Sequence, residues 1–163
     1  MDGFTLRAAT QADAPLIHGL LREFAVYLAE RAGEKPSGRF SLDAAAAARD
    51  MLGAACFTDL AFLGKEPVGL AAWYWTYKSF RAARGLFVED LYVRPAFRGR
   101  GFGRALLAHL AARAKDADGF LEWQVLDVNA DAIAFYERLG ARTGREWRNF
   151  RLESEALERL AQA

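Results

Sequence analysis

Hydrophobic positions change their period along the first fifty residues. Apolar and polar residues alternate from Phe4 to Ala8, which predicts a first β-strand. From about Ala12 to Arg31 the apolar residues recur at helical spacing, and Thr10 is a suitable N-cap for this helix. A second helix is expected from Ser41 to Leu52, because its alanine run has high helix propensity. The chain is therefore expected to begin with one strand and two helices.

Three stretches with the composition of strands occupy the middle of the chain. Cys56–Leu63 and Val68–Tyr77 flank the turn residues 64–67, and this arrangement predicts a β-hairpin. A basic loop is expected over residues 78–85, followed by a further strand from Leu86 to Val93. These three strands would form the centre of a sheet.

The remaining segments alternate between helix and strand. The expected elements are a helix from Phe102 to about Lys115, a strand from Phe120 to Val128, a helix from Asn129 to Leu139, a strand from Trp147 to Leu152 and a helix from Ser154 to Leu160. The order β-α-α-β-β-β-α-β-α-β predicts an α/β fold with a mixed sheet. No linker or internal repeat interrupts residues 1–163, so a single domain is expected.

Composition and charge exclude several classes of function. The formal net charge is +1, so bulk charge gives no reason to expect nucleic-acid or membrane binding. Cys56 is the only cysteine, which excludes an internal disulfide. The histidines His18 and His109 are isolated in the sequence, and no metal site is expected. The chain also has neither a signal-peptide pattern nor an apolar run of membrane-spanning length, so we expect a cytoplasmic enzyme.

A loop of arginine and glycine joins the strand that ends at Val93 to the following helix. It runs from Arg98 to Gly103 with the sequence Arg-Gly-Arg-Gly-Phe-Gly, and Arg104 follows. Glycine lets the backbone approach an anion closely and adopt positive φ. The free N–H groups and the dipole of the helix N-terminus favour negative charge there. The loop therefore predicts a site for a phosphate-bearing ligand.

These residues resemble the acetyl-CoA signature of the GNAT superfamily of N-acyltransferases, Arg/Gln-x-x-Gly-x-Gly/Ala. The apolar-x-Val-x-Pro pattern that precedes this signature is present at 91–95, and the segment from Asn129 to Ala141 resembles the later cofactor and catalytic helix of the family. The resemblance implies the GNAT fold, a central mixed, mostly antiparallel sheet flanked by helices. It also implies acetyl-CoA bound by Leu91, Tyr92, Val93, Arg98, Gly99, Arg100, Gly101, Phe102, Gly103, Arg104, Asn129 and Tyr136.

Two residues of the later helix are candidates for chemistry. Acetylation needs a proton donor for the leaving thiolate, and a phenol is protonated at neutral pH. Tyr136 resembles the tyrosine that has this role in the family, although it could instead pack in the core beside Phe135. Asn129 can cap its helix, and in relatives an asparagine here also contacts the cofactor.

Glu89 and Asp90 are candidate bases for deprotonating the amine, directly or through water. Adjacent strand residues point to opposite faces, so only one would face the acceptor unless a β-bulge intervenes. Glu89 is preferred because relatives of the most similar branch use the first carboxylate of such a pair. The alternative is an exposed acidic pair at the start of a strand.

A narrower resemblance, to the diamine (spermidine/spermine) and thialysine N-acetyltransferase branch, concerns the acceptor. It rests on the segments 23–27, 75–77, 88–93, 125–129 and 146–150. The branch implies a homodimer acting on a small-molecule amine. The matches to this branch, together with the positions where the chain departs from it, assign six residues to the acceptor: Tyr27, Lys78, Glu89, Asp90, Asp127 and Trp147.

Two departures from the polyamine pattern shape the expected substrate. The polyamine enzymes have acidic residues where this chain has Leu28 and Lys78, and a lysine in the channel would repel a multiply cationic acceptor. A lysine-like amino acid or a diamine is therefore expected. The alternatives are a protein N-terminal acetyltransferase and a non-catalytic acyl-CoA-binding module. A Rossmann protein is disfavoured, because its glycine motif follows an early strand.

Overall fold

The computed structural model describes residues 3–35, 40–144 and 150–162. They fall into two compact units, Met1–Val128 and Asn129–Ala163. The first unit holds the sheet and three helices, and the second holds two helices. The expectation of a single domain over residues 1–163 stays a prediction.

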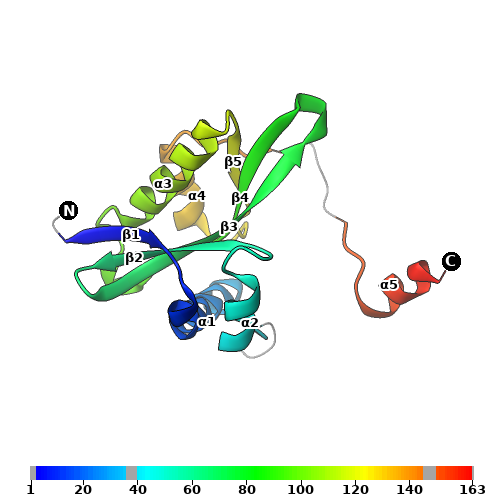
Figure 1. Cartoon of the computed structure of the whole chain (residues 1–163), viewed down its shortest axis with the longest axis horizontal. Coiled ribbons are helices and arrows are strands. Elements are labelled where there is room, and N and C mark those ends of the chain that lie inside the picture. The colour runs from blue at the N-terminus through cyan, green and yellow to red at the C-terminus, as the bar shows by residue number, and fades with distance from the viewer. Residues whose placement is uncertain (1–2, 36–39, 145–149, 163) are drawn as a thin grey trace. The chain divides into compact units, whose positions relative to one another are not determined.

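A five-stranded sheet forms the centre of the first unit (Figure 1). Its strands, in spatial order, are β1 (Phe4–Ala8), β2 (Phe57–Leu63), β3 (Glu66–Lys78), β4 (Ala83–Val93) and β5 (Phe120–Trp123). The first four pair antiparallel, and β5 runs parallel to β4. The expected mixed, mostly antiparallel sheet is therefore confirmed, although β5 ends at Trp123 instead of Val128.

Helices cover both faces of this sheet (Figure 1). The helices α1 (Ala14–Ala32) and α2 (Ala44–Asp50) lie on one face, and α3 (Phe102–Asp116) lies on the other. The core between α1, α2 and the sheet includes Ile17, Leu20, Ala47, Leu60, Leu70, Ala72 and Tyr92. Burial of these apolar side chains contributes most of the stability of such a layer.

Acidic side chains set where the first two helices begin. A 3₁₀ turn, Gln11–Asp13, precedes α1, and the Asp13 carboxylate accepts hydrogen bonds from the Thr10 N–H (2.8 Å) and from the two terminal nitrogens of the Arg7 guanidinium (2.7 Å each). The Arg7 hydrogen bond is the main cause that holds the pKa of Asp13 well below its ordinary value. Helix α2 begins three residues later than expected, because Asp43 caps it by accepting from the Ala46 N–H at 2.7 Å.

The β3–β4 hairpin extends beyond the rest of the sheet as a long arm (Figure 1). Both ends of residues 78–85, expected as a loop, instead continue the ladder, with Lys78 opposite Ala83 and Thr76 opposite Gly85. Only a 3₁₀ turn, Ser79–Arg81, connects the strands. The basic composition of residues 78–85 reflects their exposure on the arm and not an irregular backbone. The expectation of a loop was therefore wrong for half of this segment, Lys78 and residues 83–85, and right for the turn over residues 79–82.

The second unit contains α4 (Ala130–Arg138) and α5 (Ser154–Ala161). The Gly140 φ of 88° lies in the left-handed region, consistent with the expected stop after α4. The first half of the expected strand Trp147–Leu152 lies outside the described residues, and its last three residues form no strand. No helix among the described residues has the length and apolar character needed to cross a bilayer.

Candidate functional site

The glycine loop connects the end of β4 to the start of α3. A 3₁₀ turn, Pro95–Phe97, follows β4, and Gly101 caps α3 with a φ of 87°. The first backbone hydrogen bond of the helix runs from the Ala105 N–H to the Gly101 carbonyl at 3.0 Å. The preceding N–H groups at the start of the helix therefore have no helical carbonyl to bind. Free N–H groups of this kind can bind an anion, and the phosphate site at this loop stays a prediction.

Arginine side chains surround this helix start. The Arg98 Nε donates to the Val93 carbonyl at 2.9 Å, and its guanidinium lies 4.1 Å from the centre of the Tyr27 ring. Arg100 lies over the rings of Phe97 and Phe102 at 5.5 and 5.3 Å. Arg104 is exposed in the first turn of α3. These arginines have their side chains at the protein surface, where they are available to an anionic ligand.

An ion pair connects α1 to the end of β4. The Glu23 carboxylate accepts from Arg94 at 2.7 and 3.0 Å and from the Tyr92 hydroxyl at 3.3 Å. The Tyr92 ring is buried against Phe24. Its side chain therefore serves the core, and only its backbone is left for the cofactor role that the resemblance implies. Tyr27 is one turn after Glu23, and its ring lies under the Arg98 guanidinium; its assignment to the acceptor stays a prediction.

A β-bulge interrupts β4 at the candidate bases. Asp90 lies opposite Ala72, but Val88 lies opposite Trp73, so Glu89 is an extra residue on its strand. Phe87 lies opposite Tyr74. Paired residues project from the same side of a sheet, so Asp90 and Phe87 share the face of Ala72 and Tyr74. The bulge that the sequence analysis left open is present.

The same face continues onto β5 and along the arm. Glu122 lies opposite Phe87, and Lys78 is four residues beyond Tyr74 on β3. We call this surface, defined by Tyr74, Lys78, Phe87, Asp90 and Glu122, the Tyr74 face. The Lys78 ammonium pairs with the Glu122 carboxylate at 2.9 Å and lies 5.6 Å from the Phe120 ring. Lys78 is thus present at the candidate site as a paired cation.

Titratable groups gather around the bulge. Asp90 is half-buried, and burial, helped by the charge of Glu89, raises its pKa to about 6. Burial and the charges of Asp90, Glu89 and Asp50 raise the pKa of the Cys56 thiol to about 11. Cys56 therefore stays protonated at neutral pH and packs against the core, as expected. A carboxylate with a pKa near 6 can accept a proton at neutral pH.

Sequence reasoning missed Tyr74. Burial, and then the charge and hydrogen bonding of Glu89, raise the pKa of its phenol. Its ring stacks on Phe87 with 5.2 Å between centroids. A strand tyrosine among other aromatic residues carries no signal of its own, because the contact depends on the register that the bulge produces.

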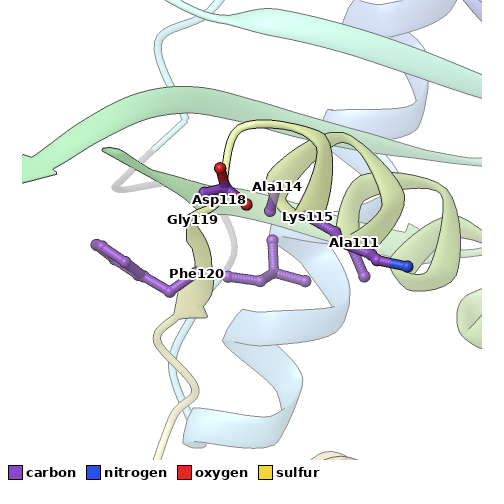
Figure 2. Close-up of a pocket in the computed structure, with 7 residues that line it drawn as sticks. Ala111, Ala114, Lys115, Asp118, Gly119 and Phe120 are labelled. Atoms are coloured by element: carbon purple, nitrogen blue, oxygen red, sulfur yellow. The ribbon is translucent and has the colours of Figure 1, made fainter. Parts of the chain in front are cut away.

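The pocket at the other end of α3 is a separate feature. Figure 2 shows its lining by the last turns of the helix and the start of β5, namely Ala111, Ala114, Lys115, Asp118, Gly119, Phe120 and Leu121. The carbonyl end of a helix disfavours anions. This pocket therefore does not provide the phosphate site.

The second unit holds two further candidates. Asn129 precedes α4 and is buried, and its Oδ1 has no hydrogen-bond partner among the residues that the structure describes. An unsatisfied buried acceptor is costly, so this atom fits contact with a ligand that carries N–H or O–H donors. Tyr136 is half-buried on α4, with its ring 5.2 Å from that of Phe135. Asp127, in the first unit, is exposed, and Trp147 lies outside the described residues.

The model of the Acetyltransferase (GNAT) family matches residues 19–141, which include the glycine loop, the bulge and α4. The chain belongs to this family.

Curated relatives of the chain include two kinds of amino-acid acetyltransferase. It is 41% identical over 93 residues to the L-ornithine N5-acetyltransferase NATA1 of Arabidopsis thaliana, a match over 56% of this chain and 41% of that enzyme. It is 32% identical over 170 residues to the thialysine N-epsilon-acetyltransferase of Bos taurus, over 96% of both chains. The match thus spans less than half of the plant enzyme and nearly all of the bovine one.

Solved structures confirm the fold. The integron cassette protein VCH_CASS6 from the mobile metagenome of V. cholerae superposes with a TM-score of 0.80 at 20% identity, covering 100% of both chains. At this identity the likeness concerns the architecture alone.

Because Asp90 carries a raised pKa, we predict that Asp90→Asn stabilises the protein at pH 8. Below the ordinary aspartate pKa of 3.8, the carboxyl is neutral in both the folded and unfolded states. Stability conferred by the bound proton is lost as the pH rises through the folded pKa of about 6. The amide has no charge to desolvate, so the variant should gain about 1–3 kcal/mol at pH 8 and almost nothing at pH 4.

Urea unfolding at both pH values measures this difference. Asp116→Asn, which changes an exposed carboxylate in the same way, is the control. An Asp90→Asn variant that is less stable than wild type at pH 8 would contradict the prediction.

Proposed function

We propose that the chain is an acetyl-CoA-dependent N-acetyltransferase that acetylates a primary amine of a small molecule, either a lysine-like amino acid or a diamine. The observation that carries the proposal is the bulge in β4, with Glu89 and Asp90 beside it and the glycine loop beyond the end of the same strand. Membership of the family and the names of the relatives support the reaction. The proposal includes a homodimer, which the narrower resemblance implies, and a cytoplasmic location.

Acetyl-CoA supplies the acetyl group as a thioester. Its pyrophosphate would lie against the N–H groups at the Gly101 cap, with Arg98, Arg100 and Arg104 neutralising its charge. The left-handed Gly101 allows the backbone to approach the phosphates without a Cβ. The unsatisfied Asn129 Oδ1 would accept from the amide or hydroxyl groups of the pantetheine arm.

The carboxylates at the bulge would prepare the acceptor. An ammonium group cannot attack, because its lone pair is held by a proton. Glu89, directly or through water, takes that proton, and Asp90 alongside adds the negative charge that attracts the cation. The neutral amine nitrogen then forms a bond to the acetyl carbon, and the carbon–sulfur bond breaks. Tyr136 gives its proton to the departing thiolate, and the proton that the attacking nitrogen must still lose passes through water to the resulting phenolate, so the products are an amide and a free thiol and Tyr136 is restored.

Lys78 supports a lysine-like amino acid as the acceptor. Its ammonium lies on the same face as Tyr74 and Phe87, held by Glu122. An amino acid with a side-chain amine could place that amine at the bulge and its carboxylate toward Lys78. A polyamine would instead bring a second cation toward this lysine, at a cost that falls with exposure and salt.

An amine panel tests the proposed function. Free-thiol release from acetyl-CoA should be measured with lysine, ornithine, thialysine, putrescine, spermidine and a peptide with a free N-terminus. We expect kcat/KM to be highest for the amino acids with a side-chain amine. Gly101→Val should lose acetyl-CoA binding, whereas Gly64→Val, which strains a second left-handed glycine in the β2–β3 turn, should keep it. No turnover with any amine, or a preference for the peptide, would overturn the proposal.

The assignment of Tyr136 as the acid predicts the effect of removing one hydroxyl. Tyr136→Phe keeps the ring beside Phe135 and should lower kcat by about a hundredfold or more, with little change in acetyl-CoA affinity. Steady-state kinetics and calorimetry with CoA separate the two quantities. Full activity of the Phe variant would show that Tyr136 serves packing instead.

The role given to Lys78 predicts an inversion of specificity. Lys78→Asp places a second carboxylate beside Glu122, so kcat/KM should rise for spermidine and fall for lysine, by about three- to tenfold at low salt. Lys65→Asp makes the same charge change in an exposed turn and should alter neither. Equal effects of Lys78→Asp on both acceptors would show that Lys78 does not contact the acceptor.

A further inference from the structure

The Arg98 side chain, although exposed, is held at two places at the start of the glycine loop. Its Nε donates to the Val93 carbonyl at 2.9 Å, where β4 ends. Its Cζ lies 4.1 Å from the centre of the Tyr27 ring and 5.9 Å from that of Tyr92. The other donors of the guanidinium are on its two terminal nitrogens, and within the described part of the chain no acceptor binds them. These donors are therefore left for a ligand at the loop.

The Tyr27 ring is itself fixed by the packing of α1. It is half-buried, and it stacks on the ring of Phe24 with 6.4 Å between centroids and an interplanar angle of 19°. Phe24 in turn packs on the buried Tyr92 ring at 5.3 Å. The ion pair between Glu23 and Arg94 holds the same part of α1 against the end of β4. The ring therefore has a set position beside the first residue of the glycine loop.

A contact with a fixed ring prepares an arginine to bind phosphate. A guanidinium over a ring face is attracted to it without using its N–H donors. An exposed arginine without such a contact loses its rotamer freedom only when it binds the anion, and this loss lowers affinity by about two- to tenfold. In this chain the ordering is already present before any ligand binds, because Tyr27 and the Val93 carbonyl both contact Arg98.

We infer that Tyr27 is a positioning residue, whose ring holds the Arg98 guanidinium in the orientation that binds the pyrophosphate of acetyl-CoA. This inference rests on the proposed function. It differs from the acceptor role that the narrower resemblance gives to Tyr27, because a ring in contact with the amine would change the use of the acceptor and not of the phosphates. Arg31 lies over the same ring at 5.3 Å, further from its centre than Arg98.

Two acetyl donors separate a role at the phosphates from a general effect on the fold. Acetyl-pantetheine carries the same thioester as acetyl-CoA but lacks the pyrophosphate and the nucleotide. We expect Tyr27→Leu, which removes the ring, to lower kcat/KM for acetyl-CoA about fivefold. The value for acetyl-pantetheine and the KM of the amine should stay unchanged. Tyr27→Phe keeps the ring face and should restore kcat/KM for acetyl-CoA.

Phe62→Leu is the matched control, since it removes a ring that lies 4.8 Å from another guanidinium, that of Arg7. It should keep wild-type kinetics with both donors. Wild-type kinetics in Tyr27→Leu, equal losses with both donors, or the same loss in Tyr27→Phe would overturn the inference. A rise in the KM of the amine without a loss specific to acetyl-CoA would also overturn it, in favour of the acceptor role.

Calorimetry with CoA tests the contact without turnover. The Kd for CoA should rise about fivefold in Tyr27→Leu. Because Tyr27 acts through Arg98, the substitution should have almost no effect on the Kd in an Arg98→Gln background and its full effect in an Arg31→Gln background. A full effect in the Arg98→Gln background would overturn the inference. If wild type bound CoA but acetylated no amine, the proposed function would fail, and this cycle alone would decide the role of Tyr27.

Discussion

The ladder between β3 and β4 cannot stay regular past Ala72, because Asp90 lies opposite Ala72 and Val88 lies opposite Trp73. One residue, Glu89, has no place in the pairing. A regular strand would send successive carboxylates to opposite faces of the sheet. The extra residue changes this alternation, so that Asp90 and Phe87, three positions apart, project from one face. The arrangement of the titratable groups follows from this single irregularity.

The surroundings of a carboxylate differ between the two faces of the sheet. On the face covered by α3, Asp59 is almost fully buried, but it accepts from the Trp73 Nε1 at 2.8 Å and pairs with Arg113 at 3.4 Å. Such partners offset the loss of water. On the other face, burial and a neighbouring negative charge raise the pKa of Asp90. A carboxylate whose pKa is raised in this way is typical of functional sites, because its charged form lowers the stability of the fold and does not serve the structure.

Most of the fold was predictable because local patterns determine it. The alternating residues of β1 and the helical spacing of α1 each describe an element that buries one face. The arm was mispredicted because the basic composition of residues 78–85 describes their exposure, while cross-strand contacts such as Arg84 over the Trp75 ring, at 3.9 Å, keep them paired. The same distinction, between local patterns and contacts across strands, applies to the candidate site. The glycine loop is local and was recognised, whereas the neighbours of Tyr74 depend on a register between strands.

The Tyr74 face also gives a physical reason for an acceptor with one amine and one carboxylate. Tyr74 and Lys78 are four residues apart on β3, or about 13 Å between Cα atoms in an extended strand. Lys78 does not extend freely from the arm, since its ammonium is held at Glu122, the residue opposite Phe87. The ammonium therefore lies beside β5, next to Glu122 and the Phe120 ring. Under the proposed function, the carboxylates at the bulge would attract the amine of an amino acid such as ornithine, and its carboxylate would compete with Glu122 for the Lys78 ammonium. A polyamine would instead bring a second cation toward Lys78.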